Sequence, residues 1–144
     1  MSNYNADREE DFEILYSAEQ HEIEKFSPSV LFIDQFVAEM VMDQLWEAVT
    51  PGGIVIFPEN AQLEDSMSTA PNFFRRISFS QAKTNLSGNN RILVLDDMDI
   101  PLQTTDEKLI DNLNGLADFA QATAILQEDF WEAVAGFQDQ RVSI

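Results

Sequence analysis

A run of four large apolar residues at positions 54–57, Ile-Val-Ile-Phe, limits the fold of this chain more than any other feature. The run lies between a Pro-Gly-Gly turn at 51–53 and Pro58. Short β-branched apolar runs bounded by turn residues are typical of buried strands. The sequence therefore predicts a buried strand at residues 54–57, and the rest of the chain must supply the side chains that cover it.

The chain of 144 residues is long enough for one domain with a sizeable core. Folding at this size buries roughly 70% of the surface of the unfolded chain, and eleven Phe and two Trp supply large apolar side chains. We therefore expect a single domain over residues 1–144. Within the acidic segment 1–26, residues 6–26 fit an additional amphipathic helix, although Phe12, Ile14 and Tyr16 alternate as in a strand.

Two long amphipathic helices are predicted, one before and one after the central strands. Residues 30–49 place their apolar side chains on one broad arc, between a Ser-Pro-Ser start signal at 27–29 and the Pro-Gly-Gly stop. After a helix start at 104–107, residues 116–138 also carry an apolar arc at helical spacing. We expect both helices to pack their apolar arcs on the sheet.

A β-hairpin is predicted from residues 73–83 and 91–95, because the loop between them at 85–90 is rich in Asn, Ser and Gly. The polar stretch 60–72 is predicted to be a loop. The order of helices, three strands and helices predicts an α+β fold. In this fold a small antiparallel β-sheet of about three strands packs against long amphipathic helices at both ends of the chain.

Composition excludes several classes of protein. The chain carries 26 Asp and Glu against 8 Lys and Arg, a formal net charge of -18, and no cysteine. Without cysteine there are no disulfides and no thiolate sites, and a charge this negative argues against direct binding to nucleic acid or to a membrane. No apolar run reaches the roughly 18 residues of a membrane span, and no signal peptide is evident. We expect a soluble protein, cytoplasmic or part of a virion-like assembly; adaptation to high salt is an alternative source of the acidity.

The charge is unevenly distributed along the chain. Residues 66–95 contain no Asp or Glu but include Arg75, Arg76, Lys83 and Arg91, so this segment is +4 and the other 114 residues are -22 (-18 minus +4). The sequence therefore predicts a basic hairpin and acidic helices. Such a molecule can pack head to tail, with the hairpin of one copy against the helices of the next. The alternative is that the arginines pair with acids of their own chain.

A short motif occurs twice: Trp-Glu-Ala-Val at 46–49 and again at 131–134. At about 100° per residue each Trp lies between the apolar arc of its helix and a row of carboxylates. Aromatic anchors beside charges are typical of protein interfaces, whereas the alternative is that each Trp packs under a neighbouring element. The candidate interface residues are Glu39, Asp43, Trp46, Glu47, Arg75, Arg76, Lys83, Arg91, Glu128, Trp131 and Glu132.

Residues 91–97, Arg-Ile-Leu-Val-Leu-Asp-Asp, resemble the first strand of response-regulator receiver domains, in which paired acids after the strand bind magnesium. A receiver needs about a hundred further residues, and 47 follow Asp97. Independently of the resemblance, Asp96, Asp97 and Asp99 could hold Mg²⁺ or Ca²⁺ through hard oxygen ligands. The alternative, which we favour, is a solvated strand end with Asp99 in the turn before Pro101.

A second resemblance covers residues 30–57. The apolar stretch 30–34, a helix-length run and the Pro-Gly-Gly strand resemble a strand-helix-strand unit of class I methyltransferases, but no cofactor-binding motif is present. That fold needs several earlier strands, and only 29 residues precede Val30. We therefore keep the helix for residues 30–49.

No catalytic site is predicted. His21 is the only histidine, and no Ser-His pair or histidine metal site can be assembled from one imidazole. We expect a non-enzymatic protein without a cofactor that binds other proteins, as an assembly or structural subunit of a larger, virus- or phage-like complex. The alternative is an acidic inhibitor or DNA mimic that blocks a basic nucleic-acid-binding protein. A third hypothesis is a magnesium-dependent enzyme with Asp96, Asp97 and Asp99 as its metal ligands. The partner is thus another copy of the chain or a basic protein.

Overall fold

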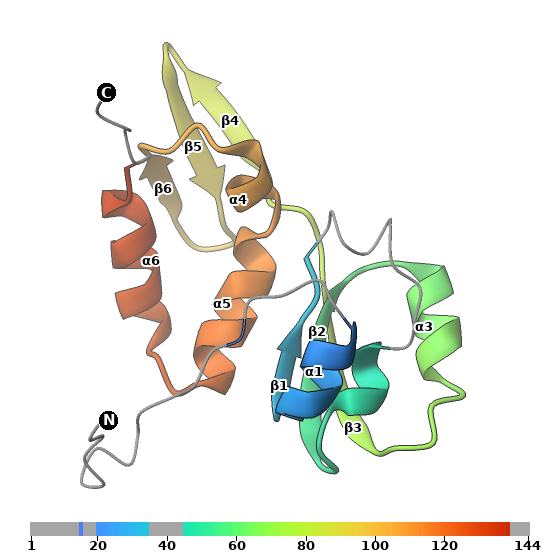
Figure 1. The fold of residues 1–144 in the computed structure, drawn as a ribbon. Helices are drawn as coiled ribbons and strands as arrows, with labels where there is room; N and C mark the ends of the chain where they lie inside the picture. The colour runs from blue at the N-terminus through green and yellow to red at the C-terminus, as the bar shows by residue number, and fades with distance from the viewer. Residues whose placement is uncertain (1–14, 16–19, 35–44, 139–144) are drawn as a thin grey trace, which may run out of the picture.

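The structure is a computed structural model that describes residues 15, 20–34 and 45–138 (Figure 1). These residues form two three-stranded sheets and five α-helices. The elements in order are α1 (Gln20–Phe26), β1 (Val30–Phe32), the 3-10 helix η1 (Leu45–Ala48), β2 (Gly53–Pro58), α3 (Ala61–Met67), β3 (Phe74–Phe79), β4 (Thr84–Ser87), β5 (Asn90–Val94), β6 (Asp99–Leu102), α4 (Glu107–Asp111), α5 (Leu113–Ala122) and α6 (Gln127–Gly136).

The first sheet is parallel, in the order β1-β2-β3, with β2 at its centre. In β2 the side chains of Val55, Ile56 and Phe57 are all buried. A central parallel strand is covered on both faces, so both sets of alternating side chains are apolar. The prediction of a buried strand at residues 54–57 is confirmed.

One face of the parallel sheet packs on α1, η1 and α3, whose apolar residues form a core with Val55 and Phe57. Figure 1 shows these elements with the sheet in one lobe, which we call the parallel-sheet lobe. The opposite face packs on α5. There Phe32 and Phe79 stack with ring centroids 5.6 Å apart, beneath Gly115 of α5.

Gly115 allows α5 to approach this sheet closely. A Cβ at position 115 would lie 2.5 Å from the ring of Phe79 and 2.8 Å from the ring of Phe32. Real Cβ atoms do not come so near to other carbon atoms, because interiors are close-packed without overlap. Gly115, in the first turn of α5, is therefore a position of close contact between this helix and the sheet.

The second sheet is an antiparallel meander in the order β4-β5-β6. Gly88, with φ of +66°, lies in the turn between β4 and β5, where a left-handed residue suits a tight hairpin. The sheet packs one face on α4 and α6, and we call this group the antiparallel-sheet lobe. Helix α5 contacts α4 and α6 as well as the parallel sheet, so it joins the two lobes.

The predicted fold class is confirmed only as a mixture of helices and sheets. The long helix expected at 30–49 is wrong at its start, because Val30–Phe32 forms strand β1. This strand is held by pairing: Ile54 donates its N–H to the carbonyl of Ser29 (2.9 Å), and Ile33 donates to Ile56 (2.8 Å). Residues 35–44 lie outside the described part of the chain, as do 1–14, 16–19 and 139–144.

The long helix expected at 116–138 is also wrong, because the chain turns between α5 and α6. Ala124 has φ of +69°, and the N–H of Ile125 donates to the carbonyl of Ala120 (2.8 Å), a hydrogen bond typical of a helix end. The turn lets α5 cover the parallel sheet while α6 covers the antiparallel one. A single straight helix could not face both sheets.

The predicted hairpin is displaced along the chain. Strand β3 pairs with β2 in the parallel sheet, and the real hairpin joins β4 to β5, so β4 occupies residues that we had assigned partly to a loop. The expected loop at 60–72 contains α3, where the side chain of Asn60 accepts a hydrogen bond from the N–H of Leu63 (3.0 Å). Within the described residues, no helix is long and apolar enough to cross a membrane.

Candidate functional site

Strand β3 carries the two arginines of the acid-free segment at an edge of the parallel sheet. Its ends are anchored by the buried side chains of Phe74 and Phe79, while Arg75 and Arg76 are exposed. Neither arginine forms an ion pair with any residue in the described ranges. Charged side chains on an edge strand discourage indiscriminate pairing, and here they also leave two positive charges open to a partner.

Phe73 precedes this strand and is the most exposed large apolar residue of the described chain, with 76% of its surface accessible. Its carbonyl accepts a hydrogen bond from Gly52 (2.9 Å). The neighbouring Asn72 side chain donates to the carbonyl of Trp46 (2.9 Å). The backbone at this point is therefore pinned while the phenyl ring projects into solvent. We call Phe73, Arg75 and Arg76 the basic edge.

The other two basic residues lie in the antiparallel-sheet lobe. Lys83 is exposed just before β4. Arg91 on β5 donates to the carboxylate of Glu107 on α4 and, through Nε, to the hydroxyl of Thr84 (3.2 Å). The +4 segment is thus divided between two sheets, and the alternative of pairing within the chain holds for Arg91.

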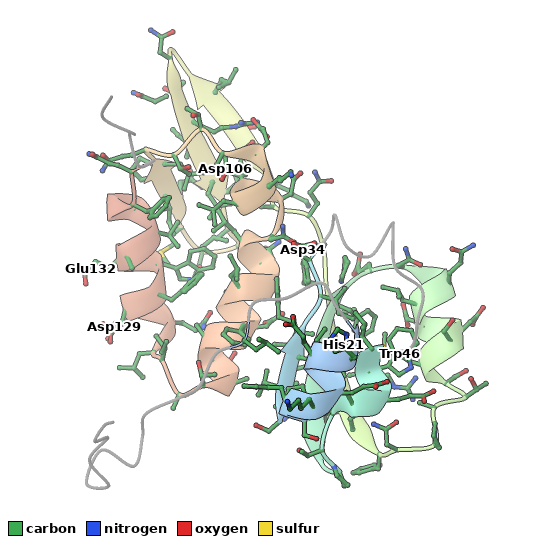
Figure 2. All side chains as sticks on the ribbon, in the orientation of Figure 1. His21, Asp34, Trp46, Asp106, Asp129 and Glu132 are labelled. Atoms are coloured by element: carbon green, nitrogen blue, oxygen red, sulfur yellow. The ribbon has the colours of Figure 1, made fainter. Side chains whose placement is uncertain are left out.

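Helix α6 presents three exposed carboxylates, Glu128, Asp129 and Glu132, which we call the acidic flank. Figure 2 shows Asp129 and Glu132 on the side of α6 that faces away from α5. Acids in the first turn of a helix are stabilised by its dipole. Residues 109–138 contain no Lys or Arg, so no base in α5 or α6 offsets these charges.

Beside the acidic flank, an apolar pocket of about 170 Å³ opens between α4, α5 and α6. Thr104 is its single residue with a polar side chain. Of the lining residues, Val134 is buried, whereas Ala133 and Phe137 are exposed and therefore lie where the pocket meets solvent, at its mouth. The lining residues are Thr104, Leu109, Leu113, Leu116, Phe130, Ala133, Val134 and Phe137.

The two Trp residues of the repeated motif have different surroundings. Trp46 is only 1% exposed, within the core of the parallel-sheet lobe, so the prediction that it is a surface anchor is wrong. Its indole N–H has no hydrogen-bond partner among the described residues. Trp131 is half-buried and meets Phe130 edge to face, with centroids 4.8 Å apart. Glu47 is exposed on η1. Glu39 and Asp43 lie outside the described residues.

The three aspartates considered for metal binding lie around the turn between β5 and β6. Asp96, Asp97 and Asp99 are exposed, and the turn is closed by the N–H of Leu95, which donates to the carbonyl of Met98 (2.9 Å). Among the described residues, no three His, Asp or Glu side chains are grouped to hold a metal ion. His21 is exposed on α1.

Among the described residues, one carboxyl group has a shifted pKa. Burial raises the pKa of Asp118 on α5 above the usual value for aspartate. The physical cause is desolvation, which disfavours the charged form. The shift has no contribution from another charged group, so we assign Asp118 no role in binding.

Comparison with protein-family models and with curated proteins finds no match for this sequence. Function must therefore be inferred from surface chemistry. Sequence reasoning identified the charged residues Arg75, Arg76, Glu128 and Glu132 but missed Phe73, Asp129 and the pocket. The apolar residues at 126, 130, 133, 134 and 137 have helical spacing, and they had been assigned to the buried face of one long helix.

Proposed function

We propose that this protein is a non-enzymatic assembly subunit, in which the basic edge of one copy contacts the acidic flank of the next. The observation that carries the proposal is the separation of two exposed, oppositely charged surfaces. Figure 1 shows β3 in the parallel-sheet lobe and α6 in the antiparallel-sheet lobe, on the other side of α5. A contact between such surfaces is heterologous, so it closes into a ring or propagates as a filament. A virus- or phage-like particle is the setting that we favour.

Charge supports this contact more than apolar area does. Arg75 and Arg76 have no ion-pair partner among the described residues, and the acidic flank has no base within its own helix. Complementary potentials of this kind set register and speed association. Exposed charges are screened over about 8 Å at physiological salt and about 3 Å at 1 M. Assembly should therefore weaken as salt is added.

Sedimentation velocity across protein concentration and salt tests the proposal. The wild-type chain should form species larger than a monomer at low salt, and these should dissociate at 1 M. The double substitution Arg75→Glu with Arg76→Glu should reduce the association constant about tenfold or more. Lys25→Glu with Lys83→Glu changes the net charge equally at two other exposed positions and should retain assembly. A wild-type monomer under all conditions would contradict the proposal.

A rescue experiment identifies the partner surface. Asp129→Lys with Glu132→Lys should also prevent assembly, because it places like charges opposite Arg75 and Arg76. When this variant also carries Arg75→Glu and Arg76→Glu, the two surfaces are again complementary and assembly should return. Failure of the fourfold variant to assemble would show that the basic edge binds something other than α6.

The acidic flank also favours a second candidate, an inhibitor that imitates a nucleic acid. Glu128 and Glu132 are one turn apart on α6, roughly 6 Å at about 1.5 Å per residue, which is close to the phosphate spacing of a nucleic-acid strand. In this case the partner is a basic nucleic-acid-binding protein. The variant Arg75→Glu with Arg76→Glu would still bind such a partner, whereas it would no longer assemble with itself.

A further inference from the structure

The apolar pocket has no occupant within the described chain, and its chemistry suits one large apolar side chain. Its walls are carbon-rich, contributed by α4, α5 and α6. An apolar cavity of about 150 Å³ in another protein binds benzene, and this pocket measures about 170 Å³. A phenyl ring is therefore of suitable size and polarity.

The charges around the pocket favour an aromatic side chain that is flanked by positively charged residues. Ala133 lies at its mouth, and Asp129 precedes Ala133 by one helical turn. Glu132 is adjacent to Ala133 in sequence and exposed. An apolar group that enters the pocket thus brings its flanking residues nearest to Asp129, because the helix turns Glu132 about 100° away from Ala133.

The same molecule displays such a group at Phe73. Its ring is 76% exposed on a backbone held by hydrogen bonds, and Arg75 and Arg76 follow within three residues. A rigid, exposed aromatic beside two guanidinium groups has the composition of an interface anchor. Arginine side chains are long enough to cross the rim of a pocket to carboxylates beyond it.

Phe73 cannot fill the pocket of its own chain. It lies at the start of β3 in the parallel-sheet lobe, whereas the pocket belongs to the antiparallel-sheet lobe, beyond α5 (Figure 1). We propose that Phe73 of one copy inserts into the apolar pocket of a second copy, while Arg75, which alternates onto the same side of the strand as Phe73, pairs with Asp129 there. This inference rests on the proposed assembly function and specifies its contact.

The central test uses two variants that block opposite halves of the contact. Phe73→Ala removes the inserted ring and keeps the pocket, whereas Ala133→Trp fills the pocket mouth and keeps the ring. Each variant alone should lose assembly, with an association constant reduced about 30-fold or more, as for a buried aromatic anchor. An equimolar mixture should form a dimer of one copy of each and nothing larger, because only one functional contact exists per pair.

Controls separate this contact from the general charge attraction. Leu86→Ala removes another highly exposed apolar side chain, 74% accessible on β4, and should leave assembly unchanged. Circular dichroism should show native folding for each variant. If Ala133→Trp fails to fold, Ala133→Glu places a charge at the same mouth and replaces it in the mixing experiment.

The outcomes distinguish the two proposals. If Phe73→Ala assembles like the wild type while Arg75→Glu with Arg76→Glu does not, the insertion is wrong and the charge-driven assembly stands. If both single variants lose assembly but their mixture gives no heterodimer, the ring and the pocket belong to different contacts and the insertion is wrong. If the wild-type chain is monomeric throughout, both proposals are overturned.

Discussion

The two lobes bury their sheets to different extents. In the parallel-sheet lobe, Val55, Ile56 and Phe57 have almost no contact with solvent because helices cover both faces. In the antiparallel-sheet lobe, no residue of β4 is buried, and a pocket remains between the covering helices. Parallel strands require crossovers that cover the sheet, whereas an antiparallel sheet can leave one face in water. The first lobe therefore provides a rigid base for the basic edge, and the second provides the cavity.

The largest expected effect on the free energy of unfolding comes from a substitution in the core of the parallel-sheet lobe. Phe57→Ala removes a buried ring from the centre of the parallel sheet and should destabilise the fold by about 3–5 kcal/mol. Leu86→Ala, on the exposed strand of the other sheet, should change the free energy of unfolding by no more than about 0.5 kcal/mol. Urea denaturation under monomeric conditions measures both. Similar losses for the two variants would show that the lobes do not differ as described.

A smaller effect is expected where α5 meets the parallel sheet. Gly115→Ala places a methyl group against the rings of Phe79 and Phe32, which should cost about 1–3 kcal/mol through overpacking. Gly136→Ala is a matched control, because a Cβ at position 136 meets no atom within 4 Å. Thermal unfolding followed by circular dichroism should show a lower Tm for the first variant alone. An unchanged Tm for Gly115→Ala would mean that α5 packs less tightly on the sheet.

The smallest expected effect concerns Asp118, on the helix that joins the lobes. Because burial raises its pKa in the folded state, the folded chain holds this proton more tightly than the unfolded chain. Its contribution to stability therefore falls as pH rises from the ordinary aspartate value through the raised one. Asp118→Asn should be more stable than the wild type at pH 7, by no more than about 0.5 kcal/mol for a partly exposed group.

Comparing the two proteins at several pH values provides the control for this last prediction. The stability difference between Asp118→Asn and the wild type should shrink as the pH falls through the raised pKa of Asp118, because the carboxyl group then becomes protonated. Thermal melts across this range measure the difference. A difference that does not depend on pH would indicate that the carboxyl group is not desolvated.

Local sequence predicted those elements whose signal does not depend on a distant partner. The buried strand at 54–57 followed from β-branched residues between turn residues, and the turn of the hairpin, though not its first strand, followed from Asn and Gly near position 88. The partner of each strand could not be predicted, because residues 74–79 suit a parallel or an antiparallel neighbour equally well. The register of β3 with β2 depends on contacts between residues 21 positions apart in the sequence.

Residues 30–34 show why the helix prediction at 30–49 was wrong. A short apolar run has no periodicity of its own, so it continues a helical arc as well as it forms a strand. The resemblance to a strand-helix-strand unit had assigned this stretch correctly as a strand, and its parallel pairing with β2 agrees with that unit. The resemblance was set aside because the missing cofactor motif argued against the whole fold, although the local element did not depend on that motif.

The candidate site was predictable in its charges but not in its apolar part. Arg75, Arg76, Glu128 and Glu132 are exposed as expected, because desolvation of an unpaired charge is costly. For Trp46 the sequence could not distinguish a boundary position from a core position. The pocket beside Phe130 exists only because the chain turns at Ala124, and no residue pattern specified which surface would remain uncovered.

The sequence by itself determined the buried central strand, the turn residues that bound it and the separation of a basic segment from acidic ones. These properties depend on side-chain chemistry and on neighbours close in the chain. Only the tertiary structure decided that two sheets form instead of one, that Arg91 is paired while Arg75 and Arg76 are open, and that Phe73 and the pocket lie in different lobes. These outcomes depend on which surfaces, distant in sequence, bury each other from water. Because the hydrophobic effect is non-directional, a local sequence pattern does not specify which surfaces will pair.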